Sequence, residues 1–172
     1  GLRYARQYGV ERPVQADIAA LPFAPAAFDL LVSMDVIVHF ERGREGQPVA
    51  EFARVLKPGG IAVIRASALD VLRSRHSMFA QERQRFTRTR LTQLLASYGF
   101  DVLRATYANS LLLPVAVAKF RVWEPLTGQP PSSGVEPVAP WLDRLLYAPL
   151  ALEAELVSRG INLPLGQSVI AI

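Results

Sequence analysis

The segment FDLLVSMDVIVHF, residues 28–40, begins with a short apolar run and continues into polar residues. The run FDLLV at residues 28–32 has the composition of a parallel strand that is buried on both faces. Ser33, Met34 and Asp35 follow at the carboxyl end of this strand, which is the end where open α/β sheets bind their ligands. The segment therefore predicts a sheet strand whose last residues belong to a binding site.

A helix and a second strand follow this segment. Residues 49–56 place Val49 and Phe52 at helical spacing, and the sequence KPGG at residues 57–60 stops the helix. Proline cannot continue a helix, and glycine tolerates a positive φ. Residues 61–66 form the next predicted strand. The order strand, helix, strand is a β-loop-α-turn-β unit, which is typical of α/β proteins.

The remaining core elements have weaker signals. Thr87 is a suitable N-cap for a helix at residues 90–98, and Gly99 ends that helix. Residues 67–86 have no clean period, so we expect a loop with a short helix that crosses the top of the sheet. Strands are predicted at residues 13–16, 101–108 and 168–172.

A long insertion, residues 111–165, separates the last two predicted strands. It contains helices at residues 110–123 and 141–158, joined by a proline-rich linker. We expect it to pack against the core, cover the substrate pocket as a lid, dock on a partner subunit or lie on a membrane surface. The predicted organisation is a core of residues 1–110 and 166–172 plus this insertion.

The composition is that of a globular α/β protein, since 51% of the residues are hydrophobic and 20% are charged. The absence of cysteine excludes disulfides, thiolate metal sites and cysteine nucleophiles. The two histidines lie in different segments, which argues against a metal site. The longest uncharged stretch, residues 105–118, is too short for the roughly 20 residues that span a bilayer. The excess of arginine over lysine favours a cytoplasmic bacterial protein.

The net charge is +4, and a basic stretch lies at residues 73–90. Such a stretch fits a solvated surface, a rim that binds an acidic substrate or a nucleic-acid site. Only Phe79 and Phe86 are interleaved with its arginines, which argues against nucleic acid. Arg65, at the end of a predicted strand, is a further candidate for binding an acidic group.

Four segments resemble, in order and spacing, the class I S-adenosylmethionine (AdoMet)-dependent methyltransferases, in particular the type 11 small-molecule group. The resemblance implies a Rossmann-like sheet, AdoMet as the cofactor and methyl transfer to a small-molecule acceptor. The segments are QADIAALPF at 15–23, FDLLVSMDVIVHF at 28–40, ARVLKPGGIAVI at 53–64 and RFTRTRLTQLLASYGFDVLRATYANSLLLP at 85–114.

The resemblance also implies that the chain lacks the first two strands of the family. No G-x-G sequence, the core of the family's cofactor loop, occurs in the chain, and residues 1–9 resemble the end of the helix after the second strand. We therefore expect the chain by itself to be inactive and to bind AdoMet weakly or not at all. The alternative is a non-catalytic binding or scaffold domain that retains the fold. A dehydrogenase is disfavoured, because the dinucleotide fingerprint is absent.

The resemblance implies two groups of cofactor-binding residues. Asp17 would accept the adenine amino group, with the Ile18 amide on a ring nitrogen and Leu21 against the adenine face. The alternative for Asp17 is that it caps the turn that follows. The second group, facing the methionine part of AdoMet, is Ser33, Met34 and Asp35.

The resemblance places the acceptor near His39 and the basic stretch. His39 is a candidate general base, or else a polar loop residue, and Val38 stands where the family often has glutamate. His76, Arg83 and Arg85 lie in the segment that covers the acceptor side. A guanidinium presents a fork to carboxylate or phosphate, although both arginines also fit a plain surface role.

Overall fold

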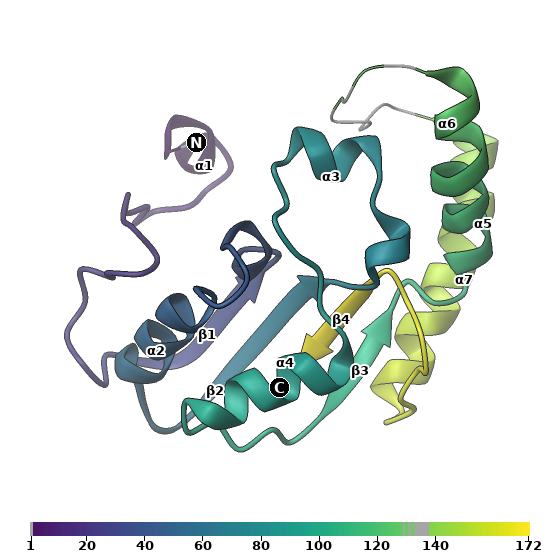
Figure 1. The fold of residues 1–172 in the computed structure, drawn as a ribbon. Coiled ribbons are helices and arrows are strands. Elements are labelled where there is room, and N and C mark those ends of the chain that lie inside the picture. Colours follow the sequence, from purple (N-terminus) through teal and green to yellow (C-terminus); the bar gives the residue numbers. More distant parts are fainter. Residues whose placement is uncertain (1, 129, 131, 133–137) are drawn as a thin grey trace.

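The computed structural model describes residues 2–128, 130, 132 and 138–172. Its centre is a four-stranded sheet with the order β1-β2-β4-β3 (Figure 1). β1 (Phe28–Met34) is parallel to β2 (Leu56–Ser67), whereas β4 (Ser168–Ala171) is antiparallel to both β2 and β3 (Ala105–Ala108). The predicted α/β class is confirmed, and the described sheet is mixed.

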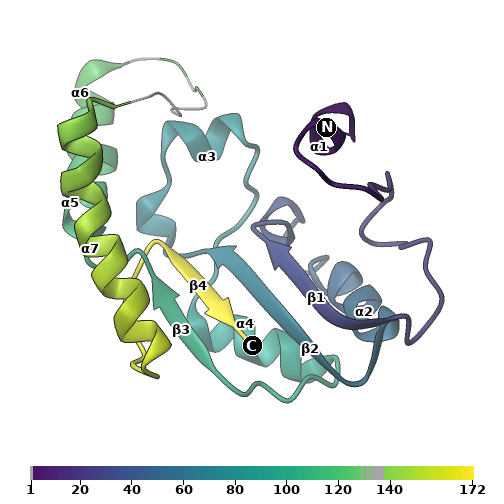
Figure 2. The same ribbon diagram turned by 180° about the vertical axis from the view of Figure 1, so that it is seen from behind.

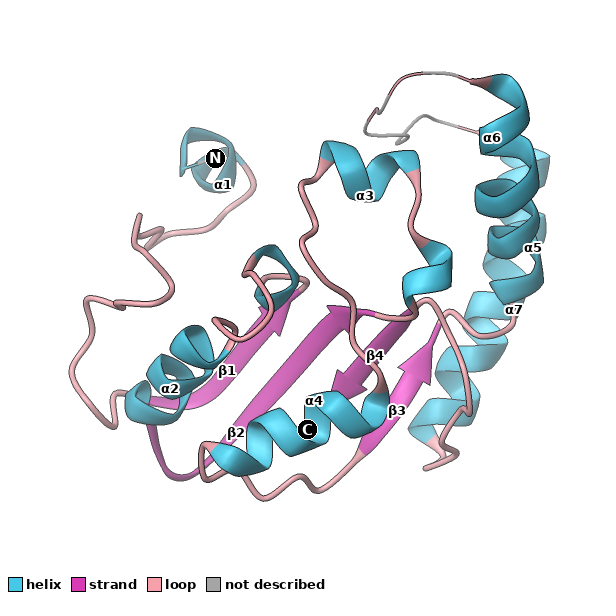
Figure 3. Cartoon of the chain, viewed as in Figure 1, coloured by secondary structure: helices cyan, strands magenta, loops and turns pink. Residues whose placement is uncertain are grey.

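Two helices cover one face of this sheet (Figures 1 and 3). They are α2 (Gly46–Val55) and α4 (Arg88–Ser97). Phe52 of α2 and Leu91 of α4 are fully buried in one apolar cluster with Ile64 of β2. The burial of such side chains is the main stabilising term of the fold. The core of the molecule therefore lies between these helices and β2.

The opposite face is covered only in part. Figure 2 shows α7 (Pro140–Ser158) beside β3 and β4 on the side away from α2 and α4. Along β1, every second side chain is on this face and is exposed: Leu30 to 57%, Val32 to 56% and Met34 to 52%. α1 (Leu2–Gln7) contributes no buried residue. The β1 half of this face is therefore apolar and is not covered by any described helix.

The segment between β2 and α4 crosses the carboxyl ends of the strands, as predicted. It contains η2 (Asp70–Leu72) and α3 (Arg75–Phe79), and Ser74 caps α3 by accepting a hydrogen bond from the Ser77 amide. Thr87 caps α4, accepting from the Arg90 amide at 3.2 Å, so this prediction is confirmed. A further turn, η1 (Ile37–His39), follows β1.

The insertion contains two helical rods. The first joins α5 (Leu113–Ala118), the π-helix η3 (Lys119–Trp123) and α6 (Glu124–Thr127), and the second is α7. The buried Glu153 carboxylate of α7 accepts hydrogen bonds from the amides of Asn109, Ser110 and Leu111. The second rod is thereby bound to the start of the first.

The helical predictions for the insertion agree with these elements, while part of the predicted linker, residues 129, 131 and 133–137, lies outside the described residues. None of the described helices is both long and apolar enough to cross a bilayer.

The predicted strand at residues 13–16 is wrong. The segment is a loop, with only an isolated bridge between Asp17 and Ala20. A strand needs a neighbour for its backbone hydrogen bonds, and the described sheet ends at β1. The KPGG turn is instead part of a bulge at the start of β2, where Gly59 has φ +77°.

Several predicted boundaries also differ. β2 spans Leu56–Ser67 instead of residues 61–66, and α4 spans Arg88–Ser97 instead of residues 90–98. α2 begins at Gly46 instead of residue 49, and β3 begins at Ala105 instead of residue 101.

Candidate functional site

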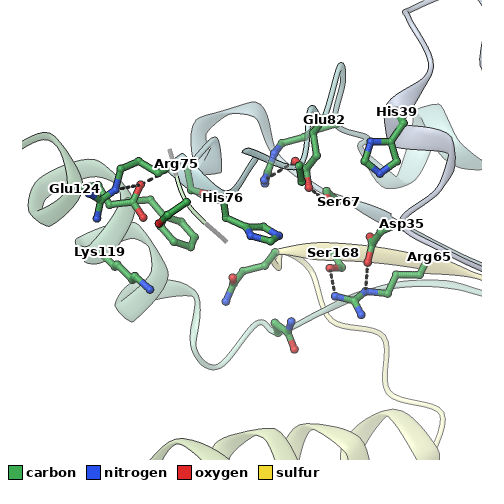
Figure 4. Close-up of a pocket in the computed structure, with 17 residues that line it drawn as sticks. Asp35, His39, Arg65, Ser67, Arg75, His76, Glu82, Lys119, Glu124 and Ser168 are labelled. Carbon is green, nitrogen blue, oxygen red and sulfur yellow. Dashed lines mark hydrogen bonds and ion pairs between the residues drawn. The ribbon is translucent and has the colours of Figure 1, made fainter. Parts of the chain in front are cut away.

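A pocket of about 430 Å³ lies at the carboxyl ends of β1 and β2 (Figure 4). Separate parts of the chain form its wall, including Asn109 after β3 and Ser132 of the linker. The other parts are the end of β1 with η1, the end of β2, the segment of α3 up to Arg85, the first rod of the insertion and the start of β4. The polar lining residues include Asp35, His39, Arg65, Ser67, Arg75, His76, Glu82, Arg85, Lys119, Glu124 and Ser168.

Asp35 is the first residue after β1 and has an unusual conformation. Its φ is +55°, in the left-handed region that L-residues rarely occupy. Its Oδ2 lies 3.4 Å from Arg65 Nε, while its buried Oδ1 has no hydrogen-bond partner in the described part of the chain. Burial raises the pKa of the Asp35 carboxyl, and the charge of Arg65 opposes this rise. Strained backbone and an unpaired buried oxygen are typical of a binding site.

Arg65 joins the two central strands of the site. Besides its ion pair with Asp35, its Nη2 donates to Ser168 Oγ of β4 at 3.1 Å. β1, β2 and β4 therefore meet at one guanidinium, which holds the Asp35 carboxylate at the pocket wall.

A second ion pair fixes the segment that crosses the sheet. Arg85 Nη2 donates to Glu82 Oε2 at 2.9 Å, and Arg85 Nη1 donates to the Ala68 carbonyl. Ser67 Oγ donates to Glu82 Oε1 at 2.9 Å. The Arg85 side chain is only 8% exposed. Arg85 thus lines the pocket with a guanidinium already bound to an acid.

The other predicted acceptor residues differ in position. Arg83 is exposed and is not among the lining residues, and its amide donates to the Val38 carbonyl. His76 and His39 both line the pocket (Figure 4). The structure therefore brings His39, His76, Arg85 and Asp35 to one pocket and leaves Arg83 outside it.

A third ion pair links α3 to the insertion. The Arg75 amide donates to Glu124 Oε2 at 2.8 Å, and Arg75 Nε lies 3.8 Å from the same oxygen. The insertion is therefore part of the pocket wall. Lys119 and Phe120 of η3 extend this wall.

The predicted adenine-binding residues lie outside this pocket. The Oδ1 of Asp17, an exposed residue, accepts a hydrogen bond from the Ala19 amide, which is the geometry of a turn cap. Ile18 and Leu21 pack against the core. Their role toward AdoMet stays a prediction.

A clamp on α2 holds this loop in place. The Leu21 amide donates to Glu51 Oε2 at 2.7 Å, and Arg54 donates to the carbonyls of Leu21 and Phe23. The hydrogen bonds from Arg54 and the Leu21 amide lower the pKa of Glu51 to about 2. The loop of residues 17–23 is therefore bound to α2 through charged hydrogen bonds.

The second predicted cofactor group lies at the end of β1. Ser33 is buried on the covered face, and its Oγ has no hydrogen-bond partner among the described residues, while Met34 is half exposed on the other face. Of these three residues only Asp35 lines the pocket. Their role toward the methionine part of AdoMet stays a prediction.

Sequence reasoning missed several members of this wall. The sequence could have indicated Glu82, because it is the only acidic residue within the basic stretch at residues 73–90. Lys119, Glu124 and Ser168 had none, since they reach the site only through the path of the insertion.

A family model described as a methyltransferase domain matches residues 1–64. A protein of Encephalitozoon cuniculi described as a methyltransferase is 42% identical over 60 residues, which are 34% of this chain and 29% of that protein. The chain therefore spans less than a third of the curated relative that it matches.

Solved structures share the fold at low sequence identity. A SAM-dependent methyltransferase of Thermotoga maritima has a TM-score of 0.57 at 15% identity, covering 98% of this chain and 66% of that one. A Galdieria sulphuraria protein named as a sarcosine dimethylglycine methyltransferase has a TM-score of 0.56 at 17% identity, covering 98% and 62%. Residues 1–64 therefore match a methyltransferase domain, and the chain as a whole shares the fold of these solved methyltransferase structures.

Proposed function

We propose that this chain forms the acceptor side of an active site that transfers a methyl group from AdoMet to a small molecule. The observation that supports this most is Asp35. It is held at positive φ at the carboxyl end of β1, with a buried, unpaired oxygen in a polar pocket. A fold does not maintain such a residue for stability, because both features cost free energy.

Methyl transfer from AdoMet requires mainly that the protein position the two reactants. AdoMet, when bound, supplies a methyl group on a positively charged sulfur. The acceptor lone pair forms the new bond to the methyl carbon while the carbon–sulfur bond breaks and the sulfur keeps its electron pair. The pocket aligns the acceptor and excludes water, which are the main requirements of such a displacement.

We assign to His39 the role of general base, which removes a proton from the acceptor. This imidazole lines the pocket on the turn that follows Asp35, and histidine is the usual general base near neutral pH. Asp35 would accept a hydrogen bond from the same acceptor group and orient it. An acceptor without a proton to lose needs only the alignment.

For the methyl donor we retain the two predicted groups. Ser33, Met34 and Asp35 would contact its methionine part at the strand end, while Asp17, Ile18 and Leu21 would contact the adenine. On the acceptor side, His76 and Arg85 line the pocket. Arg83 is two residues before Arg85 in the sequence but does not line the pocket. All of these roles depend on the intact protein, since the chain spans only part of its relatives.

The test uses AdoMet with a labelled methyl group, the intact protein and a panel of small amines, alcohols and carboxylic acids. We expect label in at least one acceptor, a loss of kcat in His39→Ala and unchanged AdoMet affinity in that variant. An unchanged kcat for every acceptor in His39→Ala would show that His39 is not the general base.

The non-catalytic alternative rests on one observation, the absence of a G-x-G loop in this chain. It predicts that the intact protein binds no AdoMet in a calorimetric titration. Micromolar AdoMet binding by the intact protein would exclude it. Micromolar binding by this chain alone would contradict the expectation that it binds AdoMet weakly or not at all.

A further inference from the structure

The charges in the pocket wall are arranged as pairs with one exception. Three arginines line the pocket, and each has an acid in the same wall: Arg65 with Asp35, Arg85 with Glu82 and Arg75 with Glu124. Each pair neutralises itself. Among the described lining residues, these are all the arginines and all the acids.

Lys119 is the exception. It lines the pocket and has no ion pair or hydrogen bond within the part of the chain that the structure describes. Its Nζ lies 5.9 Å from the ring centroid of its neighbour Phe120, a contact too weak to neutralise an ammonium group. Among the arginines, lysine and carboxylates of the described wall, there is therefore one uncompensated positive charge.

The charge of Lys119 lies at one end of the pocket. Figure 4 shows Lys119 at one end of the pocket and Asp35 with His39 at the other. Lys119 is the first residue of the π-helix η3, and π-helical turns occur frequently at functional sites. The pocket thus has a cationic end on the insertion and a hydrogen-bond-accepting end on the sheet.

We propose that the acceptor is a small organic acid, with a carboxylate or phosphate at Lys119 and its nucleophilic amine or hydroxyl at Asp35 and His39. This rests on the methyl transfer proposed above. Phe120, which lines the pocket beside Lys119, contacts the carbon part of such an acceptor. The anion goes to Lys119 in preference to Arg85, whose guanidinium is bound by Glu82, and to Arg83, which is outside the pocket.

Binding of a minimal anion tests the site without any methyl transfer. The probes are acetate, inorganic phosphate and the neutral acetamide, titrated into the chain while the amide NMR signals of Lys119 and Phe120 are followed. We expect saturable shifts with an anion and none with acetamide. In Lys119→Met the affinity should fall by roughly tenfold or more, as for the loss of a hydrogen bond to a charged group.

The control is Arg121→Met, which removes another exposed cation, two residues further along the same π-helix, that does not line the pocket. It should leave anion affinity unchanged. Equal affinities in wild type and Lys119→Met, or an equal loss in both variants, would overturn the site. A preference for phosphate over acetate selects phosphorylated acceptors, and the reverse selects carboxylic acids.

Kinetics of the intact protein then separate this inference from the proposed function. Lys119→Met should raise KM for acidic acceptors, with kcat and AdoMet affinity unchanged. Equal efficiency toward acids and their neutral amides would overturn the acidic acceptor and leave methyl transfer standing. Transfer to no acceptor at all would overturn the methyltransferase proposal, while the titration still decides whether Lys119 binds anions.

Discussion

The two faces of the β1–β2 pair have similar side chains and opposite surroundings. On one face, Leu31 packs against the core and Ile64 is fully buried beneath α2 and α4. On the other face, Leu30 and Val32 are more than half exposed, and Ile61 of β2 is 48% exposed. The register pairs Leu30 with Ile61, so the exposed residues are continuous across both strands.

This difference shows what an apolar strand pattern does and does not predict. The run FDLLV indicated burial on both faces, and one face is buried as predicted. The second face has the same composition, but α7 reaches only the β3 side (Figure 2). An apolar strand pattern therefore predicts that a sheet face can be buried. Whether the face is buried depends on whether another helix or chain packs against it.

The strongest test of the covered face is Phe52→Ala. Phe52 is 2% exposed in the cluster with Ile64 and Leu91. Removing its ring leaves a cavity, so the free energy of unfolding should fall by about 3–5 kcal/mol. Urea denaturation measures this change. A loss below about 1 kcal/mol would mean that α2 is not packed as described.

A second test concerns the loop that α2 holds on the covered side. Glu51→Gln removes the charge that binds the Leu21 amide and Arg54, so the variant should be less stable at neutral pH. The pKa of Glu51 is lowered from 4.5 to about 2, so its stabilising effect is complete above 4.5 and is lost as the pH falls toward 2. The two proteins should therefore converge at low pH. A difference that persists at pH 2 would contradict the clamp.

A third test addresses the pocket end of β1. Burial raises the pKa of Asp35, so the folded state binds its proton more tightly and wild type loses stability as the pH rises above 3.8. Asp35→Asn keeps the left-handed conformation accessible and removes this loss. Its advantage in unfolding free energy should grow with rising pH. An advantage that is constant with pH would show that the carboxyl is not perturbed.

The smallest effect is expected on the uncovered face of β1. Val32→Ser changes a side chain that is 56% exposed and should shift the unfolding free energy by less than about 0.5 kcal/mol. Light scattering should show less association, because a large exposed apolar patch promotes it. A large, concentration-dependent loss of stability would mean that another chain covers this face in solution.

The sequence predicted the elements whose signals are local. The helix of residues 88–97 has its own cap in Thr87, and the strand at residues 28–34 has its own apolar pattern. The strand at residues 13–16 failed because strand formation needs a partner, which sequence pattern does not supply.

In the site, too, the residues placed by local sequence could be predicted and those placed by the path of the chain could not. Asp35 and His39 follow one strand, so their common location could be predicted, and the structure brings both to the pocket. Lys119 and Glu124 could not be predicted, because their place depends on how the insertion returns over the sheet. The roles of all these residues toward ligands stay predictions.

The junction at Ser110 has a consequence for the design and divergence of this chain. The hydroxyl of Ser110 donates to the carbonyl of Leu165, and Glu153 binds the amide of the same serine. The insertion therefore leaves and rejoins the sheet at a single point. A segment whose two ends touch can be shortened, lengthened or exchanged with a closure cost that changes only slowly with its length. Residues 111–165 can thus be exchanged as a unit, which would change the part of the pocket wall that contains Lys119, Phe120 and Glu124 while the sheet stays the same.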